Sequence, residues 1–359
     1  MVSFETVSEQ QEAKRLLRAA LDDALAHAYL FHGPPGVGKR ALATAFAAEL
    51  LGDEARVGRG SHPDLYVLEP LGDQIRIDAI RRLRHDLHMR PFEADRRVYL
   101  IFGAHAMNEE AADALLKDLE EPPSYAVIVL VADELGSLPP TIRSRCQLVP
   151  FRRLSERTVR EAIAAQAPEL SADEATAIAR VAAGRLDRAA LLLNDEASKR
   201  RAARLELARM VYRAPEFDAA AAAEVVVAGS RARAREAREA AERELSGLEL
   251  TERESEQRLR RAARGAEREE LLAALEELAA WYRDLVAFSA GADVAVHCDH
   301  AAELREDAAV EVLPAAEEAA ELAREAWREL AEFNLNAALA FEALFVRLRR
   351  AFAGVALAA

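Results

Sequence analysis

The segment Leu30 to Arg40, with the sequence LFHGPPGVGKR, constrains the fold of this chain more than any other feature. Its glycines, Gly33, Gly36 and Gly38, allow the backbone to turn tightly and to bring N–H groups close to phosphates. Lys39 supplies a positive charge for the terminal phosphate oxygens. The segment therefore predicts a phosphate-binding loop, with these three glycines and Lys39 as the candidate nucleotide-binding residues.

The flanking residues supply the context that such a loop requires. Ala28 to Phe31 form a short apolar run that predicts a buried strand, and Ala41 to Leu51 predict a helix. The motif ends differently, however, because Arg40 stands where a Ser or Thr hydroxyl would bind Mg²⁺. A guanidinium has no lone pair for a metal ion and brings a positive charge to the place where the cation would lie.

A second departure affects the same metal ion. P-loop ATPases carry an acidic cluster after a later strand, where an Asp helps to hold Mg²⁺ and a Glu orients the attacking water. Val98 to Phe102 predict that strand, but Phe102, Gly103, Ala104 and His105 occupy the place of the acids. Because both departures remove the same function, they predict a nucleotide site without hydrolysis. The alternative is that a displaced carboxylate substitutes and the site is active.

Strand and helix patterns alternate through the first half of the chain. Apolar runs at 65–68 and 127–131 predict further buried strands, and 108–120 predicts a helix between strands. This alternation indicates right-handed crossovers and a parallel sheet, with ligands at the carboxyl ends of the strands. The expected fold class is an α/β P-loop domain followed by helical domains.

Only helical patterns follow Phe151. Stop signals at Gly184 and Asn194 delimit a small three-helix unit. In the segment from about 230 to 270, Arg and Glu are dense and often four residues apart, which predicts a solvated helical hairpin. A nucleic-acid-binding arm is the alternative, which the balancing acids disfavour. The expected domains are 1–153 (α/β), 154–200 (helical lid) and 201–359 (all-α).

The composition limits the remaining classes of function. A length of 359 residues with 51% hydrophobic content predicts a globular protein of two or three domains. No apolar run is long enough to cross a membrane and the N-terminus is unlike a secretory signal, so we expect a cytoplasmic protein. The net charge of -14 means that any DNA contact is local or made by partners. With two cysteines, Cys146 and Cys298, and His297 to His300 interpreted as a loop, no metal site is expected.

Five stretches together resemble the clamp-loader branch of the AAA+ ATPases, and in particular the clamp loader of bacterial DNA polymerase III. Each is weak alone, but their order and spacing are specific. They are HAYLFHGPPGVGK at 27–39, HPDLYVLEP at 62–70, RPFEADRRVYLI at 90–101, AHAMNEEAADALLKDLEEPP at 104–123 and LPPTIRSRCQ at 138–147. The resemblance thins beyond about Leu193. Many relatives have a four-cysteine zinc module where this chain has Gly52 to Ser61, which contains no cysteine.

The resemblance also implies roles for three arginines. In clamp-loader rings, the arginine of a Ser-Arg-Cys motif enters the ATP site of the neighbouring subunit, and here that residue is Arg145, with Arg143 as the nearby competitor. A guanidinium placed at a γ-phosphate in trans stabilises the charge of the transition state. In the Gly184 to Arg188 turn, which resembles the lid segment of the family, Arg188 occupies the sensor position.

The implied function is that of a stator in a five-subunit AAA+ ring that loads the sliding clamp on primed DNA. Its implied partners are the gamma/tau ATPase subunits and the delta subunit, with the residues from 201 onward forming a helical collar. No cofactor is required, and the glycines and Lys39 are compatible both with nucleotide binding without hydrolysis and with no binding. One rival interpretation is an active, gamma/tau-like clamp-loader ATPase. Another is a helical scaffold with a relic nucleotide domain.

Overall fold

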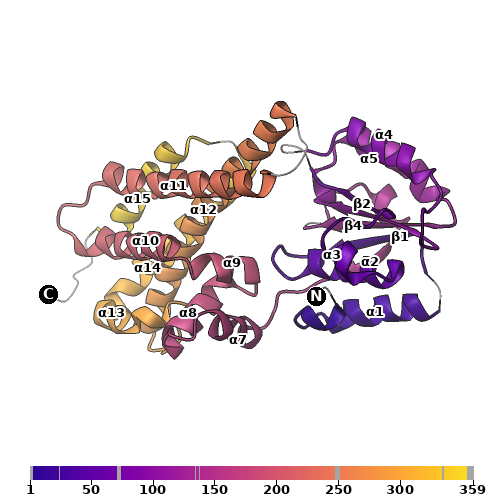
Figure 1. Ribbon diagram of the computed structural model, residues 1–359. Coiled ribbons are helices and arrows are strands. Elements are labelled where there is room, and N and C mark those ends of the chain that lie inside the picture. The colour runs from indigo at the N-terminus through magenta and orange to yellow at the C-terminus, as the bar shows by residue number, and fades with distance from the viewer. Residues whose placement is uncertain are drawn as a thin grey trace. The chain divides into compact units, whose positions relative to one another are not determined.

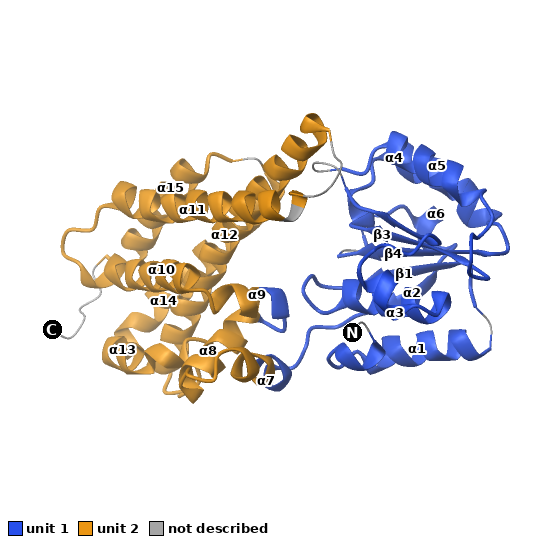
Figure 2. Cartoon of the chain, viewed as in Figure 1, with its two compact units in different colours: residues 1–159, 183–187 blue, residues 160–182, 188–359 orange. Residues whose placement is uncertain are grey.

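The computed structural model describes residues 3–23, 25–70, 74–133, 135–136, 138–246, 251–333 and 335–353. The chain divides into two compact units (Figure 2). Unit 1 comprises residues 1–159 and 183–187, and unit 2 comprises 160–182 and 188–359. The separate lid expected at 154–200 stays a prediction. None of the helices in the described ranges is long and apolar enough to cross a membrane.

Unit 1 is built on a parallel sheet of five strands in the order β2-β3-β4-β1-β5 (Figure 1). The strands are β1 (Ala28–His32), β2 (Leu65–Leu68), β3 (Arg97–Phe102), β4 (Ala126–Ala132) and β5 (Gln147–Pro150). Every residue of β3 and β4 is buried, which explains their continuous apolar sequences. In the edge strand β5 only Val149 is buried, so its sequence signal is weak. The predicted α/β fold class is confirmed.

Helices cover both faces of this sheet (Figure 1). One face carries α1 (Gln11–Asp22), α2 (Lys39–Leu51) and α3 (Glu54–Gly58), and the other carries α4 (Ile77–Leu87) and α5 (Glu109–Glu120). The chain before α1 does not continue the helix toward the N-terminus, because Glu9 and Gln10 adopt left-handed backbone conformations with φ of 51° and 53°. A 3-10 turn, Phe4–Thr6, precedes this break.

The His-Pro-Asp stretch has a structural role in unit 1. Asp64 is fully buried, and its carboxylate accepts hydrogen bonds from the backbone N–H groups of Phe92 (2.6 Å), Glu93 (3.0 Å) and Ala94 (2.9 Å). Burial alone would raise the pKa of Asp64, but these N–H groups hold the pKa below its ordinary value. Asp64 therefore fixes the loop that leads into β3.

We expect Asp64→Asn to lower the free energy of unfolding by about 1–3 kcal/mol, because the amide loses an acceptor and places its own N–H₂ against backbone donors. Since the folded-state pKa of Asp64 is lowered, its contribution is present above the unfolded-state pKa and is lost as the pH falls through the folded-state value. The free energies of unfolding of wild type and variant, measured by urea titration, should therefore differ by the full amount near pH 6. The difference should disappear as the pH falls below about 4. The exposed Asp95→Asn in the same loop is the control; equal effects of both substitutions would contradict this role.

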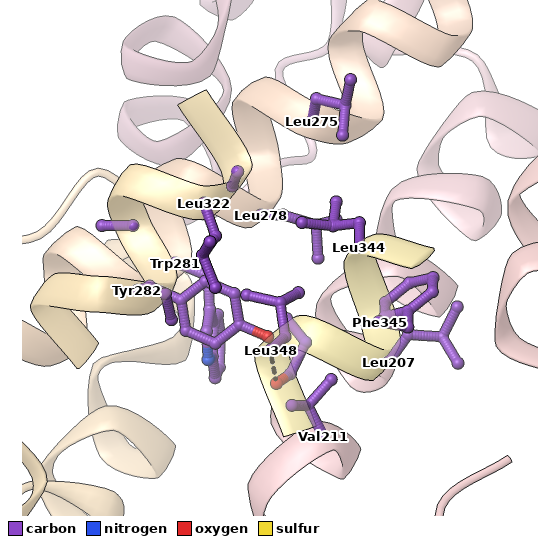
Figure 3. Packing of buried hydrophobic residues seen from close by; sticks show 14 of the residues in the cluster. Leu207, Val211, Leu275, Leu278, Trp281, Tyr282, Leu322, Leu344, Phe345 and Leu348 are labelled. Atoms are coloured by element: carbon purple, nitrogen blue, oxygen red, sulfur yellow. Dashed lines mark hydrogen bonds between the residues drawn. The ribbon is translucent and has the colours of Figure 1, made fainter. Parts of the chain in front are cut away.

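Unit 2 is entirely helical in its described part. Trp281 and Tyr282 lie at the centre of its core among leucines from several helices (Figure 3). Tyr282 donates a hydrogen bond to the carbonyl of Ala208 (3.1 Å), so this large ring is buried with its hydroxyl satisfied. The helices of this part of the chain are α7 (Glu156–Gln166, shared with unit 1), α8 (Ala172–Ala182), α9 (Leu186–Leu192, whose first two residues belong to unit 1), α10 (Asp195–Arg213), α11 (Ala219–Leu245), α12 (Glu252–Ser289), α13 (Ala301–Asp307), α14 (Leu313–Glu332) and α15 (Ala337–Ala351).

The charged segment predicted to be a hairpin forms the end of α11 and the start of α12. Thr251 and Glu254 form a capping box at the start of α12. An ion pair of 2.8 Å between Arg238 and Glu256 joins the two helices. The pKa of Glu256 is lowered to about 2 by hydrogen bonds from Arg238 and Arg260. Opposite charges thus pair across the helices, as the balance of Arg and Glu in the sequence indicates.

Candidate functional site

The glycine loop lies between β1 and α2, at the carboxyl end of the sheet, as the sequence predicts. Gly36 and Gly38 have φ of 69° and 95°, which favour glycine. A side chain at Gly33 would collide with the carbonyl of Phe151, and one at Gly36 would collide with the carboxylate of Asp187. The loop therefore has the expected backbone, but two other segments pack directly against it.

Lys39 is engaged within the protein. Its side chain is 5% exposed, and its ammonium donates to the carbonyls of Gly33 (2.6 Å) and Pro34 and forms an ion pair of 2.9 Å with Asp133. These three acceptors match the three N–H bonds of an ammonium. Burial lowers the pKa of Lys39 and the Asp133 carboxylate opposes that shift. The charge expected to meet a phosphate is thus compensated by the chain itself.

Asp133 is a site residue that the sequence analysis misses. It follows β4 directly. Its backbone N–H donates to Nδ1 of His105 at 3.1 Å, and His105 lies just after β3. The available signal is its place immediately after a buried apolar strand, because the carboxyl ends of neighbouring parallel strands meet at one edge of the sheet.

Asp187 approaches the glycine loop from the 183–187 turn of unit 1. Its carboxylate packs on Gly36 and accepts hydrogen bonds from Arg185 Nε (3.2 Å) and Nη2 (2.9 Å). The backbone N–H of Leu186 donates to the carbonyl of Gly36 at 3.0 Å. A carboxylate therefore lies where the loop would approach a phosphate.

Gln10 joins the glycine loop to Arg152, which lies two residues after the end of β5. Its amide donates to the carbonyls of Val37 (3.3 Å) and Arg152 (2.7 Å) and accepts from the N–H of Arg152 (3.1 Å). The strained backbone at Gln10 is thus held by three hydrogen bonds.

The two departures from an ATPase site are in contact with each other. The guanidinium carbon of Arg40 lies 4.1 Å from the centre of the Phe102 ring, a cation–π geometry. The same guanidinium forms an ion pair with Glu69, which follows β2. The residue in place of the metal-binding hydroxyl therefore stacks on the ring at the end of β3, beside the position expected for the acidic cluster.

Arg145 lies in the turn between the short helix α6 (Pro140–Arg143) and β5. Its Nη1 donates to the carbonyl of Thr141 (2.9 Å), its Nη2 pairs with Glu120, and its side chain is 33% exposed. The next residue, Cys146, packs against the core on the α4 and α5 side of the sheet, where burial raises the pKa of its thiol to about 12. Arg143 differs because its Nε is buried. Arg145 is thus the more exposed of the two arginines, and the finger role stays a prediction.

Arg188 and the His297 segment lie in unit 2. Arg188 forms an ion pair with Glu276 of α12 and is 12% exposed, so its sensor role stays a prediction. His297 is buried with Nδ1 3.0 Å from Asp284, beside a 3-10 turn at Cys298–His300. Within the described ranges, no three His, Cys, Asp or Glu side chains are grouped to hold a metal ion.

Comparisons with known proteins place the chain in a family. Residues 8–155 match the family model described as DNA polymerase III, delta subunit. DNA polymerase III subunit delta' of Pseudomonas aeruginosa is 42% identical over 136 residues, which cover 34% of this chain and 42% of that protein. The delta' subunit of Bacillus subtilis is 30% identical over 225 residues, which cover 59% of this chain and 68% of that protein.

Similarities also extend to other subunits. DNA polymerase III subunit tau of Bacillus subtilis is 32% identical over 168 residues, which cover 43% of this chain and 30% of that protein. A DNA polymerase III gamma subunit-related protein of Thermotoga maritima has a solved structure with 18% identity and a TM-score of 0.46, covering 95% of this chain and all of that one. The extent and identity of the delta' matches decide the assignment: the chain belongs to the family of DNA polymerase III delta' subunits of the bacterial clamp loader.

Proposed function

We propose that this chain is the stator of a clamp loader and does not hydrolyse ATP itself. It holds one position in a hetero-pentameric ring with gamma/tau and delta subunits, and the ring loads the sliding clamp on primed DNA. In this ring the chain presents Arg145 to the ATP site of an adjacent ATPase subunit.

The contact of Arg40 with Phe102 carries this proposal. Hydrolysis at a P-loop requires Mg²⁺ held by a hydroxyl and an acid, and a Glu or similar residue to orient water. Here a cation and an aromatic ring stand in those places and, because the Arg40 side chain is exposed, stabilise each other by about 0.5–1 kcal/mol. A positive charge fixed beside the phosphate loop opposes binding of a second cation there.

The retained arginine supports the second half of the proposal. Arg145 is partly exposed and its only charged partner among the described residues is Glu120, whereas Lys39 is buried against Asp133 and Arg40 stacks on Phe102 beside the loop. A guanidinium fork matches the geometry of phosphate oxygens and is always charged. The chain thus keeps the group that acts on a neighbour and lacks the groups that act on its own nucleotide.

We further propose that no cofactor is required. The Lys39 ammonium has three internal acceptors, and the Asp187 carboxylate packs on Gly36, so phosphates would have to displace both contacts. The other outcome, nucleotide bound without hydrolysis, requires the 183–187 turn to move away from the loop. The rival function is an active gamma/tau-like ATPase, which the similarity to the tau subunit favours.

Assays on the isolated chain separate these functions. We expect no Mg²⁺-dependent ATP hydrolysis and no rise in Tm on adding ADP, because the metal and phosphate positions are filled. Binding at 100 times Kd would stabilise the fold by about 2.7 kcal/mol, which a melting curve detects.

Lys39→Ala is the control, because it removes any turnover at this loop and leaves a contaminating ATPase unaffected. An ATPase rate in the wild type that this substitution abolishes would establish the rival function. A Tm that rises with ADP in the wild type but not in Lys39→Ala would establish residual nucleotide binding.

A further inference from the structure

Two of the stretches noted in the sequence meet at Arg145. Glu120 ends α5 within the stretch 104–123, and Arg145 lies in the stretch 138–147. The Glu120 carboxylate forms an ion pair with Nη2 of Arg145. On the other side of the guanidinium, Nη1 donates to the carbonyl of Thr141 (2.9 Å) and lies 3.4 Å from Oγ of Ser144. The guanidinium is therefore held from two sides by its own subunit.

The two segments that hold the Arg145 guanidinium, helix α5 and the turn before β5, are each fixed by local contacts. Helix α5 begins with Asn108 as its side-chain cap, buries Leu115 and Leu119 against the sheet, and stops before two prolines at 122–123. The turn that carries Arg145 is tied by the N–H of Arg145 to the carbonyl of Ile142 (3.1 Å). Glu120 is thus fixed at the end of a packed helix, facing a turn of defined conformation.

We infer that Glu120 is a positioning residue for Arg145, holding its guanidinium ready for the ATP site of the adjacent subunit; this inference rests on the proposed function. An arginine has many rotamers, and fixing one of them before the phosphate arrives lowers the entropy lost in the transition state. A half-exposed ion pair of this kind changes an equilibrium constant by at most about fivefold. The expected contribution is therefore modest and measurable.

Glu120 leaves Arg145 free to donate to a phosphate. A guanidinium has five N–H bonds in a fixed fork. The Thr141 carbonyl and the Glu120 carboxylate need one each, and Ser144 takes at most one more. A partly exposed carboxylate competes only weakly with a triphosphate for the guanidinium. Removing the Glu120 carboxylate is therefore expected to slow turnover rather than speed it.

The test uses the reconstituted loader and DNA-stimulated ATP hydrolysis. The Arg145-dependent part of kcat is the wild-type value minus that of Arg145→Ala. We expect Glu120→Gln to reduce this part about two- to fivefold, with KM for ATP unchanged, because positioning acts on the transition state. Glu121→Gln, at the next residue, is the matched control and should leave kcat unchanged.

The double variant Glu120→Gln/Arg145→Ala should have the kcat of Arg145→Ala alone, since Glu120 acts only through Arg145. An equal loss of kcat from Glu120→Gln in the wild-type and Arg145→Ala backgrounds would identify a merely structural role and overturn the inference. A kcat that rises or does not change in Glu120→Gln overturns it as well. If Arg145→Ala itself has no effect, the proposed function fails and the inference with it. The single Arg145 variant thus separates the two failures.

Discussion

In a reconstituted loader, Arg145→Ala is expected to slow ATP hydrolysis at the neighbouring site by about 10³-fold or more, the range seen for arginine fingers. The guanidinium is the only group of this chain that we place at that site, and alanine leaves the developing phosphate charge without it. DNA-stimulated ATPase activity of the purified complex measures the loss. The total rate should fall by the share that the neighbouring site contributes, while KM for ATP at the remaining sites is unchanged.

Arg143→Ala is the matched control for this experiment. It removes the same kind of side chain two residues away, where Nε is already buried in the subunit. We expect near-normal turnover from a loader that contains it. Gel filtration must show that both variant loaders assemble, because a lost subunit would also lower the rate. A complete loader with Arg145→Ala and a normal rate would contradict the trans role, and a deficit confined to Arg143→Ala would reassign the finger.

The sequence predicts those parts of the candidate site that depend on residues adjacent to one another along the chain. The strand, glycine loop and helix around Lys39 are local in sequence, and strands buried on both faces leave continuous apolar runs such as 127–131. The absence of a metal-binding hydroxyl at Arg40 is visible by position alone. The direct contact of Arg40 with Phe102 is not visible, because it depends on how two strands and a helix pack.

The partners of the loop could not be predicted, because they come from distant parts of the chain. Asp133 reaches Lys39 from the end of β4, and Asp187 reaches Gly36 from a turn about 150 residues later in the sequence. Gln10 carries no motif, yet three hydrogen bonds connect it to Val37 and Arg152. Long-range contacts of this kind leave no periodicity in the sequence. A sequence pattern therefore predicts the loop but not the side chains that pack against it.

Unit 2 depends on a buried ionic network that its sequence shows only as scattered charges. Arg204 of α10 makes a bidentate contact with Glu277 of α12 (2.6 and 3.1 Å) and a further bond of 2.5 Å to Glu270. Arg204 is 6% exposed and Glu277 is 2% exposed. Burial alone would raise the pKa of Glu277, but Arg204 lowers it below the ordinary value. Arg204 therefore keeps the buried Glu277 ionised, and the charge of Arg204 is balanced by Glu277 and Glu270 together.

Glu277→Ala is expected to lower the free energy of unfolding of unit 2 by up to about 3–5 kcal/mol, because the buried Arg204 loses two of its three hydrogen bonds and keeps only Glu270 as a counter-charge. Urea titration followed by tryptophan fluorescence reports on this unit, since both tryptophans of the chain, Trp281 and Trp327, lie in it. The exposed Glu329→Ala on α14 should stay within about 0.5 kcal/mol.

The double variant Arg204→Met/Glu277→Met separates the cost of an unpaired charge from the loss of a bond. If the penalty arises mainly from the incompletely balanced guanidinium, replacing both Arg204 and Glu277 by apolar side chains should recover most of the stability, as in other buried ion pairs. If the double variant is instead as unstable as the sum of its single variants, the network contributes through its hydrogen bonds. In that case the ion pair itself holds α10 against α12.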